Sequence, residues 1–301
     1  MKKITDIVNI PEIHEMKEKS LLSLSQEKPI KEFFKNNHID TKLMNEYWVE
    51  LLDYNDDYKT CQACSSLQSC PKDNQGIRKH LAYHDGEIYL ELESCPFAKI
   101  WEEKRELLSQ FEISNVNDDL MLCDMKDLSL PKKKKLTDNE KMALTQIMKY
   151  VKDPTDQGFF LHGEMGLGKT TLIASLMNAL AKKGKKIGFI HFPTYLIDLK
   201  ASFSTGDDQY AMERLMKVDY LFLDDIGEEN VTAWSRDEIL LTILSYRLLN
   251  RLPTFFTSMY GYKDLNKVYT IKKGDEIRAN TLTSKMKALS IEIMLDGEKF
   301  R

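Results

Sequence analysis

Residues 163–170 have the composition and the spacing of a phosphate-binding loop. They read Gly163, Glu164, Met165, Gly166, Leu167, Gly168, Lys169 and Thr170, which fits the pattern GxxxxGK(S/T) at each fixed position. Glycines let the backbone curl so that several N–H groups point at phosphate oxygens, and a helix beginning near Lys169 adds its positive amino-terminal end. Lys169 is expected to reach the β- and γ-phosphates, and the Thr170 hydroxyl to bind Mg²⁺. The loop therefore predicts ATP and Mg²⁺ as ligands.

An acidic pair follows an apolar run farther along the chain. Leu221, Phe222 and Leu223 predict a buried strand, which Asp224 and Asp225 end. We expect Asp224 to hold Mg²⁺, directly or through water, and Asp225 to polarise the attacking water. The alternative is that the two carboxylates only cap the helix that follows the strand.

Four later polar residues are candidates for sensing the terminal phosphate. Thr257 and Ser258 end an apolar run, so their side chains are expected at the tip of a neighbouring strand, although a solvated strand end is the alternative. Arg278 and Lys285 are late basic residues. ATPases that work as assemblies often complete the site with an arginine from a neighbour. Each of these two charges could equally be a solvated position on a helix.

The cysteines are clustered in one short segment. Four of the five in the chain are Cys61, Cys64, Cys70 and Cys95. Cys61 and Cys64 form a CxxC knuckle, which supplies two of the four tetrahedral ligands that Zn²⁺ prefers. The segment has few large apolar residues, so it needs a metal more than a core-forming segment would. This pattern predicts a structural zinc. A redox CxxC is the rival, but no thioredoxin-like βαβ pattern surrounds it.

The spacing leaves the fourth zinc ligand open. Cys61, Cys64 and Cys95 are the firm choices, and the fourth is Cys70, His80 or His84. Cys70 is slightly favoured, because four thiolates fill the site without a histidine.

Alternating strand and helix patterns must position the phosphate loop and the acidic pair. Strands are predicted at 157–163, 186–192, 219–227 and 252–259, and helices at 169–182, 195–203 and 235–250. Ser235 is the expected N-cap of the last helix, with Glu238 three residues later. Strands separated by helices of this length predict an α/β fold, with a parallel sheet covered by helices on both faces.

The amino-terminal part has a different character. Residues 1–60 are expected to be mainly helical, and 97–112 to return to helix. Between them, Asp85 and Gly86 predict the turn of a hairpin, because apolar residues alternate after them. Such a short, turn-rich segment beside helices predicts a small domain separate from the α/β part.

These patterns divide the chain into domains. We expect an amino-terminal domain over 1–112 with its zinc module at 61–96, a linker over 113–140, and an ATPase domain over 141–301. The linker contains the lysine run Lys132–Lys135, which is expected to be solvated, with a DNA or partner contact as the alternative.

Composition limits the function further. The 301 residues carry a formal net charge of −4, so any nucleic-acid contact must come from a local patch or a partner. No apolar run reaches the roughly 18 residues that cross a bilayer. Glu12, Glu15 and Glu18 interrupt any candidate signal core near the start. A cytoplasmic protein is therefore expected, and in such a chain an odd cysteine count argues against disulfides.

The motifs together resemble one family, the bacterial helicase-loader ATPases of the AAA+ class. The resemblance rests on the phosphate loop, on YLFLDDIGEENVTAWSRDEI and on SYRLLNRLPTFFTSMYGYKDL, with the cysteine module in front. It implies an AAA+ P-loop domain preceded by a small helical, zinc-binding domain. It also implies that Gly163–Thr171 bind the nucleotide, one residue beyond the motif itself, and that Asp224 and Asp225 are the metal-binding and hydrolytic acids.

The resemblance also implies partners. Members load the hexameric replicative helicase onto single-stranded DNA during primosome assembly, and their amino-terminal domain binds the helicase. Other primosome proteins and self-association through the AAA+ domain are therefore expected, and no membrane. A basic turn of Lys182, Lys183, Lys185 and Lys186, with Tyr260 and Tyr262 for stacking, is a weak candidate for DNA contact, and solvated charges and core tyrosines are the alternative.

The sequence departs from the family pattern at two places. Ser258 is followed by Met259, where the family usually has asparagine. Thr281 and Lys285 stand where the family usually has two arginines, and Arg278 is out of register. Lysine supplies a charge without the planar fork of arginine. These departures leave ATP binding intact and predict weak hydrolysis. A transposition-helper ATPase and a nucleotide-binding scaffold with little turnover are the alternative functions.

Overall fold

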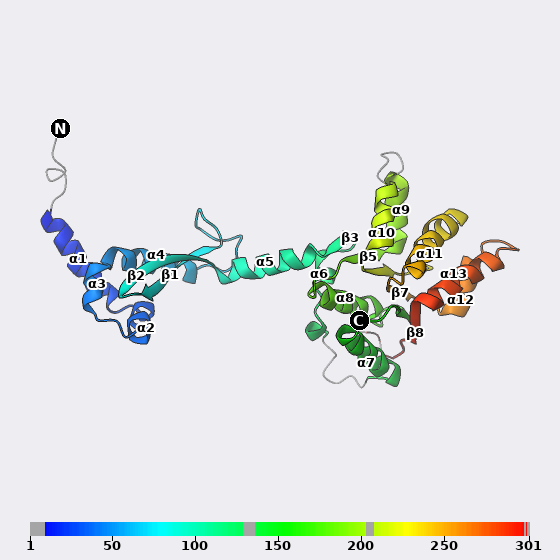
Figure 1. Ribbon diagram of the computed structural model, residues 1–301, viewed down its shortest axis with the longest axis horizontal. Helices are drawn as coiled ribbons and strands as arrows, with labels where there is room; N and C mark the ends of the chain where they lie inside the picture. Colours follow the sequence, from blue (N-terminus) through cyan, green and yellow to red (C-terminus); the bar gives the residue numbers. More distant parts are fainter. Residues whose placement is uncertain (1–9, 129–135, 203–207, 298, 300–301) are drawn as a thin grey trace. The chain divides into compact units, whose positions relative to one another are not determined.

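The computed structural model describes residues 10–128, 136–202, 208–297 and 299, coloured by sequence in Figure 1. Contacts within the chain divide it into two compact units, Met1–Glu103 and Lys104–Arg301. One helix, α5 (Pro96–Leu108), crosses this boundary in the sequence. The lysine run Lys132–Lys135 lies outside the described residues.

The first unit combines helices with a β-hairpin. Its elements before α5 are α1 (Ile10–Leu24), α2 (Lys28–Asn36), α3 (Lys42–Glu46), α4 (Trp48–Gln62), β1 (Ile77–His84) and β2 (Glu87–Ser94). Apolar side chains from the helices and the hairpin meet in one small core, formed by Leu24, Ile30, Phe34, Ile39, Leu51, Leu81 and Ile88. A core of this size supplies limited stability, so polar contacts near the cysteines matter for this unit.

The hairpin forms as the sequence predicts. Asp85 and Gly86 have φ angles of 54° and 88°, and positive φ at both central residues is the requirement of a type I′ turn. The strands pair in antiparallel register from Ile77 opposite Ser94 to His84 opposite Glu87. The twist of this turn matches that of the strands, which fixes the register of the pair.

The second unit is built on a six-stranded sheet among the described residues. Its order is β3-β5-β6-β7-β4-β8, and each neighbouring pair is parallel. The strands are β3 (Phe111–Ser114), β4 (Gly158–His162), β5 (Ile187–His191), β6 (Tyr220–Asp224), β7 (Thr254–Ser258) and β8 (Ser290–Met294). Parallel strands bring their carboxyl ends to one edge, where polar side chains can gather.

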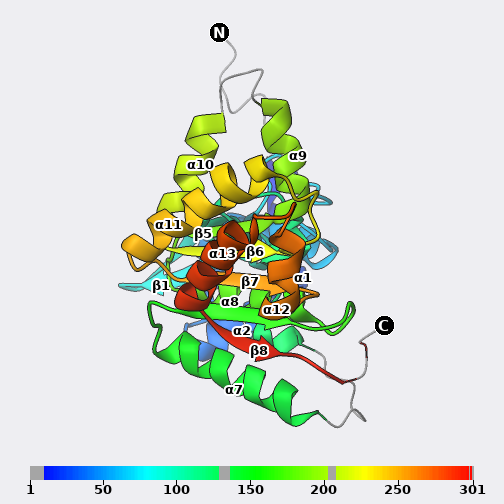
Figure 2. The same cartoon turned by 90° about the vertical axis from the view of Figure 1, so that its right-hand side faces the viewer.

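Helices cover both faces of this sheet, as Figure 2 shows. They are α6 (Asp118–Met121), α7 (Asp138–Lys152), α8 (Lys169–Ala181), α9 (Phe192–Ser202), α10 (Asp208–Lys217), α11 (Leu241–Leu249), α12 (Tyr262–Tyr269) and α13 (Glu276–Leu289), with short helical turns η2 (Met125–Asp127) and η3 (Trp234–Leu240).

Neighbouring side chains along each strand enter opposite cores. Phe159 and Leu161 of β4 join the core with α7 and α8, whereas Phe160 joins the core with α9 to α13. The same alternation holds for Phe255 and Phe256 of β7. Burial on both faces explains why these strands are continuous apolar runs. The predicted α/β fold with a helix-covered parallel sheet is confirmed.

The region from 97 to 128 differs from the expectation of a long helix followed by a linker. Helix α5 ends at Leu108, and β3 pairs with β5 at the edge of the sheet. Asn117 then caps α6, which packs against α8. Phe111, from the end of the expected helix, and Ile113, from the start of the expected linker, pack against the two cores of the second unit.

The predicted N-cap at Ser235 is wrong. Ser235 lies inside η3, a π-helical stretch whose preceding residue is Ala233. Its backbone N–H donates to the Thr232 hydroxyl at 3.1 Å, and its own hydroxyl lies 2.9 Å from the Thr232 N–H. Thr232 is therefore the residue whose side chain accepts the free N–H, one turn earlier than the sequence pattern indicated.

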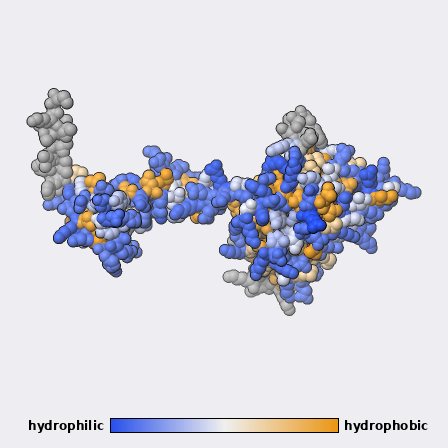
Figure 3. All heavy atoms as spheres, in the orientation of Figure 1, coloured by the Kyte–Doolittle hydropathy of each residue, from blue (hydrophilic) through white to orange (hydrophobic). Residues whose placement is uncertain are grey.

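The surface mixes polar and apolar side chains. Figure 3 shows a largely hydrophilic face with scattered apolar residues. None of the helices in the described ranges is both long and apolar enough to span a bilayer. The expected cytoplasmic location stays a prediction.

Candidate nucleotide-binding site

The predicted phosphate loop joins β4 to the start of α8. Gly166 and Gly168 have φ angles of 88° and 77°, in the left-handed region that favours glycine. At Gly163 a Cβ atom would lie 2.3 Å from the Leu295 carbonyl oxygen, which no side chain tolerates. The glycines of the motif are therefore required by backbone conformation and close packing, as well as by access for a phosphate.

Lys169 lies at the first position of α8, and its side chain turns back over the loop. Its Nζ donates to the carbonyl oxygens of Gly163 at 2.8 Å and Glu164 at 2.9 Å. The residue is buried. Burial lowers its pKa, while the carboxylates of Asp225, Glu228 and Asp224 oppose that change. The ammonium group is thus held by weak neutral acceptors, which a phosphate oxygen can replace.

Asp224 forms the centre of a hydrogen-bonded cluster at the edge of the sheet. Its Oδ1 accepts from the hydroxyl of Thr170 at 2.8 Å and from the hydroxyl of Thr257. Burial, and next the negative charge of Asp225, raise its pKa to about 6. A buried carboxylate beside a hydroxyl from the phosphate loop is the oxygen donor set that suits Mg²⁺.

Asp225 adopts a positive φ of 57°, unusual for a residue other than glycine. Its backbone N–H donates to the Thr257 hydroxyl at 2.9 Å. Its Oδ2 lies 3.5 Å from Nε2 of His191, the last residue of β5. Thr257 therefore contacts both aspartates, one through its carboxylate and the other through its backbone.

The second sensing candidate, Ser258, is directed elsewhere. Its side chain is buried, and its hydroxyl donates to the Ile226 carbonyl at 2.6 Å and accepts from the Tyr260 N–H at 3.1 Å. These bonds to the loops that follow β6 and β7 occupy the hydroxyl. Of the two strand-tip candidates, the structure thus brings only Thr257 to the acidic pair.

Sequence reasoning did not identify His191 and Glu228. His191 ends the strand next to β6, opposite Asp224 in the register of the pair. Glu228 lies near enough to Asp225 that burial and this neighbouring charge raise its pKa, with Lys169 acting in the other direction. A polar residue at the end of the predicted strand 186–192 was the available signal for His191.

Comparison with known proteins identifies the family of this chain. Residues 98–301 match the family of IstB-like ATP binding proteins. The chain belongs to this family. It is similar to the replicative helicase loader DnaI of Bacillus subtilis (strain 168), with 27% identity over 299 residues that cover 96% of this chain and 93% of that protein. The predicted resemblance to the helicase-loader ATPases is confirmed.

Solved structures agree with the assignment of this IstB-like chain. A crystal structure of DnaI has a TM-score of 0.56 at 26% identity, over 62% of this chain and 98% of that one. A structure from Streptococcus pyogenes serotype M3 has a TM-score of 0.54 at 28% identity, over 65% of this chain and 98% of that one.

The chain is also similar in sequence to a putative ATP-binding protein from an insertion sequence of Mycobacterium tuberculosis (strain ATCC 25618 / H37Rv). The identity is 25% over 145 residues, which cover 48% of this chain and 56% of that protein.

The late basic candidates lie on α13 of the IstB-like unit. Arg278 is exposed. Its positive charge adds to that of Arg236 in lowering the pKa of Asp237. Lys285 lines a shallow groove with Leu248 and Ile277. In the described parts of the chain, no hydrogen bond or ion pair joins either residue to the phosphate loop or to the acidic pair. Their sensing role stays a prediction.

The weak DNA-contact candidates are partly engaged. Lys182 pairs with Asp124, and the Lys183 ammonium donates to the Val151 carbonyl. Tyr262 is buried against Phe160, with ring centroids 4.4 Å apart, so the idea that it stacks on a base is wrong. Lys185 is exposed and Lys186 is half-buried.

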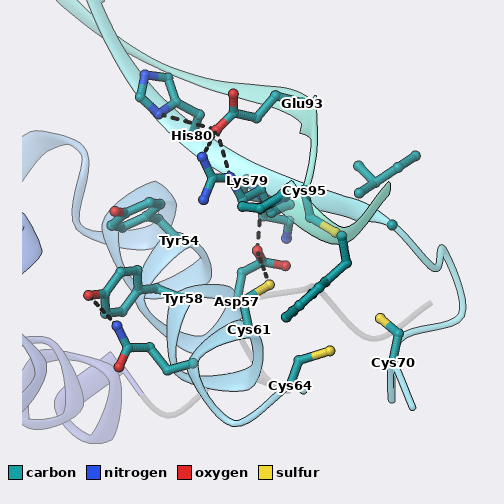
Figure 4. Close-up of a pocket in the computed structure, with 16 residues that line it drawn as sticks. Tyr54, Asp57, Tyr58, Cys61, Cys64, Cys70, Lys79, His80, Glu93 and Cys95 are labelled. Carbon is teal, nitrogen blue, oxygen red and sulfur yellow. Dashed lines mark hydrogen bonds and ion pairs between the residues drawn. The ribbon is translucent and has the colours of Figure 1, made fainter. Parts of the chain in front are cut away.

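The four clustered cysteines line one pocket of the first unit, shown in Figure 4. Cys61 lies in α4, and Cys64, Cys70 and Cys95 come from the loops that flank α4 and the hairpin. Backbone N–H groups of Lys72 and Gly76, then the Cys64 thiol, lower the pKa of Cys70.

The pocket does not confirm the predicted zinc site. Within the described ranges, no group of three or more His, Cys, Asp or Glu side chains is arranged to hold a metal ion. His80 lies at the pocket with its Nδ1 3.8 Å from a Glu93 oxygen, and His84 ends β1 at the hairpin turn. The four cysteines line one pocket, but their sulfur atoms do not converge on a common centre.

Asp57 organises the polar side of the same pocket. Its carboxylate accepts from the Lys72 ammonium, from the Lys79 backbone N–H at 2.9 Å and from the Cys61 thiol at 3.8 Å. Burial alone would raise the pKa of Asp57, but the bonds from Lys72 and Lys79 outweigh it and lower the pKa. This cluster ties α4 to β1 and to the cysteine loop.

Proposed function

We propose that this IstB-like protein is an ATP-dependent helicase loader, which delivers the hexameric replicative helicase onto single-stranded DNA during primosome assembly. The observation that carries the proposal is the extent of the similarity to the replicative helicase loader DnaI, which reaches 96% of the chain. It therefore includes the cysteine-bearing first unit, whereas the match to the IstB-like family begins at residue 98. A loader needs both a nucleotide switch and a partner-binding part.

The site geometry supports a nucleotide switch. In this proposal the loop residues Gly163–Thr171 surround the phosphates with N–H groups, and Lys169 exchanges two carbonyl acceptors for phosphate oxygens. Thr170 and Asp224 would hold Mg²⁺, which when bound would neutralise charge on the phosphates. Asp225 orients and polarises the attacking water. Thr257 is hydrogen-bonded to both aspartates, and in this proposal it senses the terminal phosphate.

A direct test is association with a replicative helicase. The full chain would be mixed with the helicase hexamer in ATP and in ADP, and the masses of the complexes measured. We expect a complex whose stability depends on the nucleotide. The Lys169→Ala variant should lose that dependence, while Lys185→Ala, an exposed lysine, should keep it. Absence of a complex under each nucleotide condition would reject the loading role.

A transposition-helper ATPase is a second candidate, favoured by the similarity to the insertion-sequence protein. That similarity covers 48% of this chain, so it leaves about half of the chain without a counterpart. Stimulation of a transposase on target DNA, without helicase binding, would favour this candidate. A scaffold with little turnover is the third, motivated by Met259, Thr281 and Lys285.

We also propose that Cys61, Cys64, Cys70 and Cys95 hold a structural Zn²⁺ after a small rearrangement of their loops. Four thiols lining one pocket support this, since four thiolates fill a tetrahedral zinc site. Metal analysis of the purified full chain should give about one zinc per chain, and Cys64→Ser should lower it. Cys123→Ser is the matched control, because Cys123 lies in the second unit. A metal-free protein with an intact first unit would refute the zinc.

Two further partners belong to the proposal. Single-stranded DNA contact is supported by the exposed Lys185, and Lys185→Glu should weaken it in a salt-dependent binding assay, with unchanged affinity as the contrary result. Self-association through the second unit is supported by Leu249 and Ile277, which are 84% and 77% exposed on neighbouring helices. Contact with other primosome proteins is proposed from the family resemblance.

A further inference from the structure

His191 lies against Asp225, the residue to which the proposed function assigns the attacking water. The His191 Nε2 atom is 3.5 Å from Asp225 Oδ2, and the two side chains are 32% and 29% exposed. The contact follows from the sheet, because β5 pairs with β6 in parallel and places His191 opposite Asp224. The imidazole is thus the neighbour that faces this carboxylate from the adjacent strand.

Two neighbours fix the orientation of the ring. The Thr194 hydroxyl lies 2.8 Å from His191 Nδ1, at the start of α9. The same hydroxyl donates to the His191 carbonyl at 3.1 Å and accepts from the Asn115 side-chain amide at 3.0 Å, so its own position is fixed. Contacts with Thr194 at Nδ1 and with Asp225 at Nε2 therefore hold the imidazole at both of its nitrogens. The ring in turn limits the orientations open to the Asp225 carboxylate.

Asn115 connects this arrangement to the edge strand β3. Its Oδ1 accepts from the His191 N–H at 2.8 Å, and its Nδ2 donates to the His191 carbonyl and to the Thr194 hydroxyl, both at 3.0 Å. The side-chain amide therefore continues the β3–β5 hydrogen-bond ladder beyond the last strand residue, Ser114. An alanine here would leave both backbone groups of His191 without these partners.

We propose that Asn115 and His191 are positioning residues for Asp225, and that β3 is the element through which turnover is adjusted. The proposal rests on the ATPase activity of the proposed function. A carboxylate aims a water molecule only when its own orientation is fixed, and a small misplacement lowers the rate strongly. β3 is one of the two edge strands of the sheet, and its register with β5 shifts between Phe111 and Ile113.

The sequence places β3 directly after α5, the helix that crosses the boundary between the two units. Only Ser109 and Gln110 separate the end of α5 from the start of β3. A partner that displaces α5 would displace Asn115 through this short connection. In this proposal, movement of α5 changes the orientation of Asp225 through Asn115 and His191, without movement of the phosphate loop.

Steady-state ATP hydrolysis by the full chain tests the proposal. His191→Ala should lower kcat about tenfold at unchanged KM, and Asn115→Ala by a smaller factor. The double variant should be no slower than His191→Ala, since the two residues act in series. His191→Gln, which keeps an N–H donor, should recover part of the loss. Asn250→Ala, at an exposed asparagine after α11, is the matched control.

The outcomes separate this proposal from the proposed function. An unchanged kcat in His191→Ala, or additive losses in the double variant, overturns the positioning roles while the ATPase activity stands. A raised KM together with a lowered melting temperature in both single variants also overturns them, because it indicates a structural role. If the wild type hydrolyses ATP no faster than Lys169→Ala, the ATPase function itself fails and this proposal with it.

Discussion

The two units organise their polar groups in opposite ways. In the second unit, Thr170, Asp224 and Thr257 come from a helix start and two neighbouring strands of one sheet, and they are hydrogen-bonded to one another. In the first unit, the four cysteines come from a helix and from loops around a hairpin, and their sulfurs do not converge. The nucleotide site is thus held by hydrogen bonds among its own side chains, whereas the four cysteines line a common pocket.

The difference follows from the size of the supporting core. The nucleotide site lies at the edge of a sheet buried on both faces, so strand register alone brings its residues together. The cysteine pocket is attached to one small core, and a metal that binds its thiolates would supply part of the folding free energy. The first unit is therefore expected to be the more sensitive of the two to ligand removal.

The largest expected effect is on hydrolysis. Asp225→Asn should lower kcat by roughly a hundredfold or more while nucleotide affinity changes little, because the amide cannot polarise water. Asp198→Asn, an exposed aspartate of α9, should have no effect and serves as control. Turnover assays with single-stranded DNA present measure the change. Equal rates for the two variants would mean that the acidic pair has no hydrolytic role.

The next effect is on nucleotide affinity. Lys169→Ala should weaken ATP binding about a hundredfold, because the phosphates lose their buried cation. Calorimetric titration measures the affinity, with Lys185→Ala as the exposed control. The zinc content that is proposed for the cysteine pocket should be the same in both variants. Loss of metal in Lys169→Ala would show that the two sites are not independent.

The first unit can be weakened separately. Asp57→Ala should destabilise it by about 2 kcal/mol, because the partly buried Lys72 ammonium loses its carboxylate. Since the pKa of Asp57 lies below its ordinary value, this contribution is present at neutral pH and is lost as the pH falls through the lowered pKa. Hydrogen exchange in the two units measures the effect, and the exposed neighbour Asp56→Ala is the control. Equal loss of protection in both units would contradict a local role.

The smallest effect is a pH dependence of metal binding at the nucleotide site. Burial raises the pKa of Asp224 to about 6, so below that pH a proton competes with Mg²⁺ for the carboxylate. The Mg²⁺ concentration for half-maximal ATP binding should rise about tenfold for each pH unit below 6. Asp224→Asn should abolish the slope. The same raised pKa means that ionisation of Asp224 lowers the stability of the metal-free protein as the pH rises from about 4 to 6. A flat Mg²⁺ requirement across this range would exclude Asp224 as the metal-binding acid.

The sequence was sufficient for residues whose chemistry fixes their spacing. Lys169 and Thr170 belong to the phosphate-loop motif, and Asp224 to the acidic strand end that such a motif predicts. The structure places Asp224 in hydrogen-bond contact with Thr170. The hairpin turn at Asp85 and Gly86 was equally predictable, because few residues accept positive φ in succession.

Other features depend on pairing that one sequence does not display. His191 acquires its neighbour only through the register of β5 with β6. Asn115 follows a four-residue strand within a polar stretch, which has the composition of a linker. Ser258 lies at the predicted position at the end of a strand, but the backbone groups of Ile226 and Tyr260 satisfy its hydroxyl.

The position of β3 has a practical consequence for anyone who divides this chain. A cut inside the polar stretch after residue 114 would separate the fragment from its outermost strand. The flank of Ile187–His191 would then present unpaired N–H and C=O groups to other molecules, and such edges promote strand exchange and aggregation. A fragment beginning near Lys104 keeps that flank covered and should be the better behaved of the two.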